Sequence, residues 1–125
     1  MTKKSVLAIG IEPAFADFAG FPQLTPELIR SYIDAQIEQL RALGFDAESC
    51  LIDLGETAEE VAVAALKANS FDCVVIGAGL REPAPQLLLF EKIVNLVHAH
   101  APAARICFNT NPADTAEAVQ RWISP

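Results

Sequence analysis

The 125-residue chain is poor in basic residues: it has 9 Lys and Arg against 16 Asp and Glu, and a formal net charge of −7. The sequence pI is about 4.7. Proteins that bind nucleic acids contact phosphates through patches rich in Lys and Arg. We therefore expect no nucleic-acid partner for this acidic chain.

Cysteines and long apolar runs are also scarce. The three cysteines, Cys50, Cys73 and Cys107, are odd in number, widely spaced and free of any C-x-x-C motif. We interpret them as buried, reduced thiols of a cytoplasmic protein. No apolar run approaches the roughly 20 residues that cross a bilayer, so we expect no membrane association. The apolar stretch near the N-terminus ends at Glu12 and Pro13, which favours a strand over a signal peptide.

What the chain does contain is a regular alternation of short apolar runs and amphipathic stretches. The expected strands and helices alternate at residues 5–11, 25–43, 47–54, 57–69, 71–76, 85–100, 105–109 and 111–122. This alternation predicts a single α/β domain over residues 1–125, with three layers around a four-stranded parallel sheet. Right-handed crossovers and strand order 2-1-3-4 place the first and last helices on one face and the middle two on the other. We expect a flavodoxin-like fold that lacks the fifth strand.

A glycine-rich stretch follows the third predicted strand and superficially matches the fingerprint of dinucleotide-binding proteins. Glu82 stands where the third glycine of that fingerprint is required, and its carboxylate would repel a pyrophosphate. Pro83 and Pro85 delay the helix whose N-terminus would hold the phosphates. We therefore interpret Gly77 and Gly79 as a tight turn or a close backbone approach in a loop that faces a ligand.

The chain also lacks the residues that other phosphate-binding or phosphorylated proteins of this topology require. The first loop carries Glu12 and Asp17 in place of the hydroxyls that bind the phosphate of FMN, and a P-loop motif is absent. A response-regulator receiver needs an aspartate where Gly77 stands. We therefore expect no cofactor.

The first loop, residues 12–24, is the most unusual segment because it holds Phe15, Phe18 and Phe21. Connections of this kind usually have about 2 to 6 residues, and longer ones are often functional. The loop follows the first strand, beside the switch point where open α/β sheets bind ligands. Its phenylalanines are interpreted either as the wall of an apolar pocket or as packing onto the sheet edge or a partner chain.

Several polar residues lie near the expected crevice, and two of them have two interpretations. Asp53 could accept hydrogen bonds from a ligand hydroxyl or could stabilise the second helix. Arg81 could bind an anionic substrate or could pair with Glu82 or Glu12. Asn111 is expected to cap the last helix, which leaves Asn109 and Thr110 free for a ligand.

Metal binding and nucleophilic catalysis have little support. His98 and His100 lie two residues apart on a helix, hence on different faces, so we expect no metal site. No G-x-S-x-G motif is present. If the protein is an enzyme, Glu12 or Asp53 would act as its general base.

The third predicted helix, residues 85–100, has an unusually wide apolar face, and Leu88 falls outside it among charged residues. Together with an exposed edge strand, this surplus predicts a homodimer. The alternative is a wide stripe packed between the second helix and the sheet.

The segments VVIGAGLR, LLLFEKIVNLVHAHAP and RICFNTNP, in this strand–helix order, resemble small flavodoxin-like (Rossmann-like) proteins of bacteria. The resemblance covers the whole chain, implies the fold and implies no particular activity.

Three functions remain open: a small-molecule-binding or interaction module with a crevice at the strand carboxyl ends, a small enzyme on a polar metabolite, or a ligand-free interaction subunit. The candidate ligand-binding residues are Glu12, Phe15, Phe18, Asp53, Gly77, Gly79, Arg81, Asn109 and Thr110.

Overall fold

The computed structural model describes residues 3–16 and 23–125. The strands are β1 (Ser5–Ile11), β2 (Asp46–Ile52), β3 (Cys73–Ile76) and β4 (Arg105–Phe108). The longer helices are α1 (Pro26–Ala42), α2 (Ala58–Ala68), α4 (Leu87–His100) and α5 (Thr115–Gln120). Short helical turns are η1 (Pro13–Phe15), α3 (Ala78–Arg81) and η2 (Ala84–Gln86).

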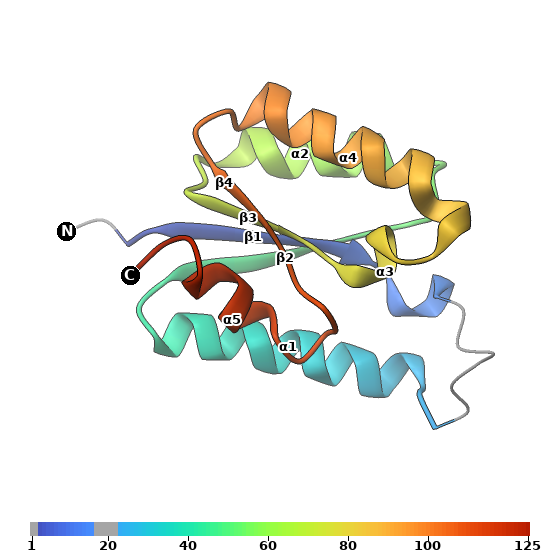
Figure 1. Cartoon of the computed structure of the whole chain (residues 1–125), viewed down its shortest axis with the longest axis horizontal. Helices are drawn as coiled ribbons and strands as arrows, with labels where there is room; N and C mark the ends of the chain where they lie inside the picture. The colour runs from blue at the N-terminus through green and yellow to red at the C-terminus, as the bar shows by residue number, and fades with distance from the viewer. Residues whose placement is uncertain (1–2, 17–22) are drawn as a thin grey trace.

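The four strands form one parallel sheet in the order β2-β1-β3-β4. In Figure 1, α2 and α4 cover one face of the sheet, whereas α1 and α5 cover the other. This arrangement confirms the predicted α/β architecture, the strand order and the placement of the helices. The fold is flavodoxin-like, with four strands in the part of the chain that the structure describes.

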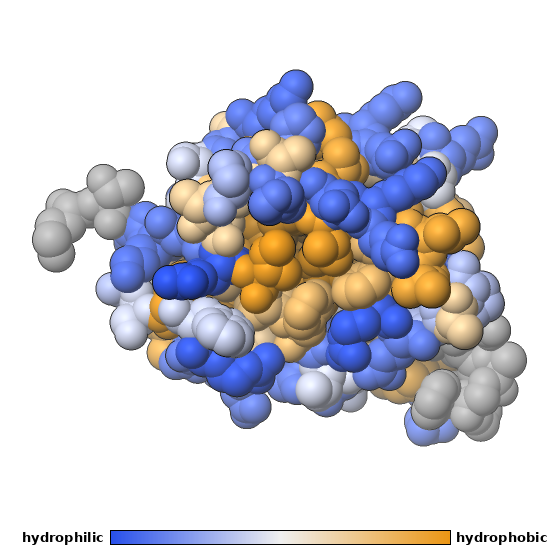
Figure 2. Space-filling view, turned by 45° about the horizontal axis from the view of Figure 1, so that its top comes forward, coloured by the Kyte–Doolittle hydropathy of each residue, from blue (hydrophilic) through white to orange (hydrophobic). Residues whose placement is uncertain are grey.

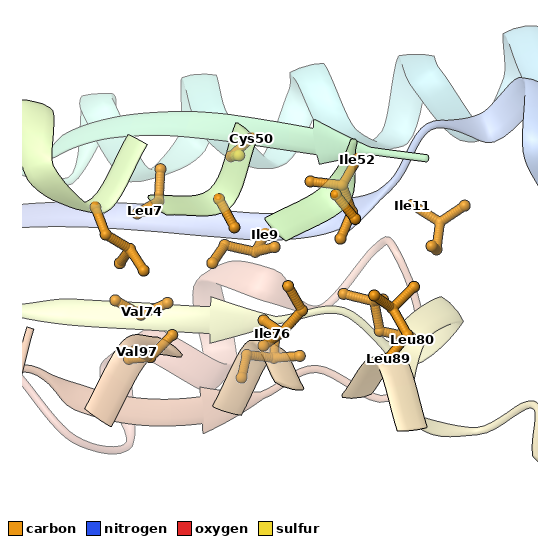
Figure 3. Packing of buried hydrophobic residues seen from close by; sticks show 14 of the residues in the cluster. Leu7, Ile9, Ile11, Cys50, Ile52, Val74, Ile76, Leu80, Leu89 and Val97 are labelled. Atoms are coloured by element: carbon orange, nitrogen blue, oxygen red, sulfur yellow. The ribbon is translucent and has the colours of Figure 1, made fainter. Parts of the chain in front are cut away.

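Alternation along β1 builds a separate core on each face of the sheet. Leu7 and Ile9 point toward α2 and α4, where Figure 3 shows them beside Val74 and Ile76 of β3 and Val97 of α4. The opposite cluster surrounds β1 on the side of α1 and α5. It contains Val6, Ile37, Leu40, Phe45, Ala47, Cys73, Val75, Cys107, Ala116, Ala118 and Val119.

Helix boundaries differ from the predictions where side chains bind nearby backbone. Thr25 caps α1 as expected, because its Oγ1 accepts the Leu28 N–H at 3.1 Å. Thr57 makes no such bond at the start of α2. The last helix begins at Thr115 rather than Asn111, because the Asp114 carboxylate accepts backbone N–H groups of residues 110 and 111 and holds this segment as a turn.

Two further boundaries were not foreseen. β2 ends at Ile52, and the one-turn helix α3 follows β3 directly, ahead of the prolines that delay α4. No helix in the described part of the chain is long and apolar enough to cross a membrane.

Candidate functional site

A cavity of about 460 Å³ lies at the carboxyl edge of the sheet, between the first half of α1 and strand β1. β1 presents only Ala8 and Gly10 to α1 at this height, and both line the cavity. Ile37 of α1 is buried against the sheet, whereas Ile29 and Ile33, closer to the start of the helix, are only half-buried and line the cavity. The small residues of β1 do not fill the space beneath the large residues of α1, and this unfilled space is the cavity.

The lining is predominantly apolar. Its apolar and glycine residues are Ala8, Ile9, Gly10, Ile11, Pro13, Phe15, Ala16, Leu24, Ile29, Ile33, Ile37, Leu51, Leu54, Gly77, Ala78, Gly79, Pro83 and Pro112. The polar residues are Gln86, Asn109 and Thr115, and none of the described lining residues is charged. This chemistry suits an uncharged ligand with a large apolar surface.

Of the predicted site residues, the structure brings Phe15, Gly77, Gly79 and Asn109 together around this cavity. Phe15 belongs to η1 and is half exposed, so the start of the first loop does form a wall. Phe18, also predicted to line the crevice, lies outside the described residues, as does Phe21.

The loop between β3 and α3 has little free backbone for a phosphate. The Gly77 N–H donates to Ile9 O at 2.9 Å, the Ala78 N–H donates to Asn109 Oδ1 at 2.8 Å, and the Leu80 N–H donates to Gly77 O at 3.0 Å. Phosphate sites in this topology depend on such N–H groups being available to the ligand. Bonds within the protein thus occupy three of the N–H groups in this segment.

Gly77 lies against β1, where a Cβ at this position would be 3.4 Å from Ile9 O and 3.5 Å from Gly10 Cα, ordinary contact distances. Its φ of −69° is also open to any residue, so neither a tight turn nor a close approach requires glycine here.

Glu12 does not line the cavity; it forms an ion pair with Arg30 of α1. The hydrogen bond and charge of Arg30 lower the pKa of the Glu12 carboxyl, against a smaller effect of partial burial. The pair connects the loop after β1 to the first half of α1, the two segments that flank the cavity. Glu12 thus positions the wall of the cavity, and its expected pairing with Arg81 is wrong.

Asp53 also lies outside the cavity lining. Its carboxylate accepts the Thr57 hydroxyl at 2.7 Å, the Thr57 N–H at 3.0 Å and the Gly55 N–H at 3.0 Å. These bonds, led by the Thr57 hydroxyl, lower the pKa of Asp53. The geometry matches the interpretation in which Asp53 stabilises the turn into α2.

Asn109 is buried, and both polar atoms of its side chain form hydrogen bonds within the protein. Its Oδ1 accepts the Ala78 N–H, and its Nδ2 donates to Thr115 Oγ1 at 3.0 Å. Thr110 is exposed and donates its hydroxyl to the Asp114 carboxylate, away from the cavity lining. The expectation that Asn109 and Thr110 remain free for a ligand is therefore wrong.

Arg81 also bonds to other groups of the protein and does not line the cavity. Its Nη2 donates to Asn109 O at 2.8 Å and lies 3.5 Å from Glu82 Oε1. The guanidinium stands 5.9 Å from the centroid of the Phe108 ring. The predicted pairing with Glu82 is therefore present, and the shorter bond to Asn109 O joins α3 to the segment after β4.

Sequence reasoning missed the residues of α1 that form half of the cavity, above all Ile29 and Ile33. A signal was present: α1 carries an isoleucine every fourth residue, whereas β1 carries Ala8 and Gly10. Such a mismatch of side-chain size predicts a void only once helix and strand are known to pack together.

Among the described residues, no group of three or more His, Cys, Asp or Glu side chains could hold a metal ion. No model of a known protein family matches this chain, and no curated protein is similar to it.

Proposed function

We propose that this protein binds a small, uncharged and largely apolar molecule in the cavity between α1 and the carboxyl edge of the sheet. The observation that carries the proposal is the lining: a cavity of about 460 Å³ whose described residues include no charged side chain. The volume falls within the range of roughly 300 to 1,000 Å³ that is usual for small-molecule sites.

The carboxylates support binding over acid–base catalysis. A general base that works near neutral pH needs a carboxyl whose pKa is raised by burial or by like charges. The pKa of Glu12 is lowered by Arg30, and the pKa of Asp53 is lowered by Thr57 and nearby N–H groups. Each is therefore a weaker base than a free carboxylate, and neither lines the cavity.

The proposal is tested by filling the cavity. Ala8→Leu places a larger side chain in the lining, whereas Ala35→Leu makes the same change on the exposed face of α1. We expect the neutral dye Nile red to bind the native protein saturably, with an affinity about 10-fold lower in Ala8→Leu and unchanged in Ala35→Leu. Native mass spectrometry of the purified protein would also show a mass above that of the polypeptide if a ligand co-purifies.

Two outcomes contradict the proposal. One is Nile red binding that does not saturate in the native protein, which means that the dye reports only surface adsorption. The other is equal affinity in the native protein and Ala8→Leu while both remain folded by circular dichroism, which places the dye elsewhere.

A second candidate function, self-association as a homodimer, is favoured by the first turn of α4. Leu87 is 54% exposed and Leu88 is 72% exposed, an unusual exposure for two adjacent leucines. The remaining apolar face of α4 packs against the sheet and α2, so it no longer argues for a partner. We expect Leu88→Glu to dissociate the dimer in sedimentation experiments without unfolding it, and Leu43→Glu to leave it intact. An unchanged assembly state in Leu88→Glu counts against this interface.

The cysteines support a reducing, cytoplasmic location as part of the same proposal. Cys50, Cys73 and Cys107 are free and buried. Burial raises the pKa of the Cys50 thiol, which makes it unreactive at neutral pH. Trapping of thiols in cell lysates, followed by mass spectrometry, should find all three reduced.

A further inference from the structure

A second hollow lies at the amino edge of the sheet, opposite the apolar cavity. Its volume is about 480 Å³, and it shares no described lining residue with the apolar cavity. The lining residues are Lys4, Asp72, Ala103, Arg105, Gln120, Arg121, Trp122, Ile123 and Ser124. Residue 4 precedes β1, residue 105 begins β4, and residues 120–124 run from the last residue of α5 toward the C-terminus. Figure 1 shows the segments after α5 and before β1 meeting at this end of the molecule.

Strand alternation directs two of the cations to the same side of the sheet. Lys4 is two residues before Val6, and Arg105 is two residues before Cys107; Val6 and Cys107 both belong to the core under α1 and α5. The side chains of Lys4 and Arg105 therefore leave the sheet on the face where α5 ends. Arg121 follows α5 directly and also lines the hollow, but its guanidinium reaches the end of β4, where Nη2 donates to Phe108 O at 2.8 Å.

Lys4 and Arg105 form no ion pair among the described residues, whereas the charge of Arg121 acts on Asp114, whose pKa it helps to lower. The one carboxylate in the described lining, that of Asp72, accepts the Ser5 N–H at 2.8 Å. A hollow that carries Lys4 and Arg105 and a single carboxylate stands out in a chain with a formal net charge of −7.

Trp122 adds an aromatic surface to the hollow. Its side chain is 56% exposed although tryptophan is usually among the better buried residues. An exposed indole beside arginines is suited to stacking on a planar ligand group.

We propose that this hollow is a binding site for a small multivalent anion of the phosphate class. Arg105 and Lys4 supply charged donors to its oxygens, whereas the guanidinium of Arg121 donates to Phe108 O and takes no part in binding the anion. The site is independent of the apolar cavity, because the two hollows lie at opposite edges of the sheet. Its ligand differs in kind from the uncharged molecule proposed for the cavity.

Trp122 is the only tryptophan of the chain, so intrinsic tryptophan fluorescence reports on this hollow alone. Pyrophosphate is the probe, titrated at low ionic strength against sodium chloride of matched ionic strength. We expect a saturable change with pyrophosphate, an affinity reduced about 10-fold in Arg105→Gln and in Lys4→Gln, and no reduction in Lys67→Gln. Lys67 lies on the exposed side of α2 and controls for loss of one positive charge.

Three results overturn the proposal. A change that does not saturate, or that sodium chloride reproduces, shows general screening and no site. An affinity reduced as much in Lys67→Gln as in Arg105→Gln shows attraction to the overall charge. Affinities unchanged in Arg105→Gln and Lys4→Gln place the anion elsewhere. Arg105 and Lys4 are exposed, and a melting temperature close to that of the native protein shows that each variant is folded.

Discussion

At the scale of single residues, Asn109 joins three segments that the chain order keeps apart. Its side chain binds the start of α3 and the start of α5, and its carbonyl accepts Arg81. Replacing a buried polar group leaves its former partners unsatisfied. We expect Asn109→Ala to lower the free energy of unfolding by about 1 to 3 kcal/mol, measured by urea denaturation.

A matched control for Asn109 is Asn111→Ala. Asn111 is exposed, and its Oδ1 accepts the Ala113 N–H at 2.7 Å within a local turn. Water can replace that bond, so the loss of stability should stay below about 1 kcal/mol. Equal losses in the two variants would mean that Asn109 has no special structural role.

Asp114 gives the fold a dependence on pH. Partial burial raises the pKa of its carboxyl, but hydrogen bonds from Thr110 and from nearby N–H groups outweigh burial, and the pKa is lowered overall. The stability that it contributes is therefore complete above its ordinary pKa of about 4 and is lost as the pH falls through the lowered value.

We expect Thr110→Val to return the Asp114 pKa toward its ordinary value, as measured by NMR titration of the carboxyl carbon. The variant should lose about 0.5 to 1 kcal/mol of stability at neutral pH and less at a pH below the lowered pKa of Asp114, where the carboxyl is protonated. A pKa unchanged in Thr110→Val would refute the role of the hydroxyl.

At the scale of elements, α1 has two halves with different roles. Ile37 and Leu40 are buried in the core, whereas Ile29 and Ile33 face the cavity. The helix is therefore anchored at one end and presents an apolar surface at the other. Thr25 stabilises the N-terminal half of α1, which faces the cavity, because it caps the helix beside the cavity wall.

Strand β4 is an edge strand, and Arg121 covers part of its open side. The Arg105 N–H donates to Asp72 O on the β3 side, so alternation turns the backbone groups of Ile106 and Phe108 outward. Arg121 Nη2 donates to Phe108 O at 2.8 Å. Figure 2 shows apolar side chains on the face where β4 and α4 lie in front. An uncovered strand edge on such a face favours pairing with another chain and aggregation.

Arg121→Ala should therefore increase self-association. We expect a larger sedimentation coefficient or visible aggregation on concentration, with little change in thermal stability, because only an edge bond is lost. Lys67→Ala, which removes one charge from α2, should behave as the native protein does. An Arg121→Ala protein that stays as dispersed as the native one would show that the arginine does not protect this edge.

At the scale of the whole molecule, the sheet separates two cores, and each depends on close packing across a layer. Ile93 of α4 is fully buried, whereas Leu88 of the same helix is 72% exposed. We expect Ile93→Ala to cost about 2 to 5 kcal/mol of unfolding free energy, because it leaves a cavity between helix and sheet. Leu88→Ala should cost less than about 0.5 kcal/mol. Chemical denaturation measures both, and similar losses would contradict the described packing of α4.

The two hollows place different chemistry at the two ends of the sheet. The carboxyl edge carries the apolar cavity, and the amino edge carries the cations around Trp122. The described lining of the cavity carries no charged side chain, and the Glu12–Arg30 pair beside it is neutralised within the protein, as suits the uncharged ligand that we propose.

The sequence by itself determined the strands, their order and the layer of each long helix. Periodicity alone separates strands from helices here, because the apolar runs are short and β-branched, and handedness of the crossovers then leaves few topologies. The sequence also argues against dinucleotide binding, because Glu82 occupies a position of the fingerprint that requires glycine.

The tertiary structure decided which of the candidate residues meet. Asp53, Arg81 and Thr110 lie near strand ends, as expected, but each is bound by a partner in its own turn or in a neighbouring segment. Which acceptor a side chain finds depends on distances between segments, and local patterns do not contain them. The cavity was hidden for the same reason: it arises where Gly10 faces α1 and depends on how two separate elements pack.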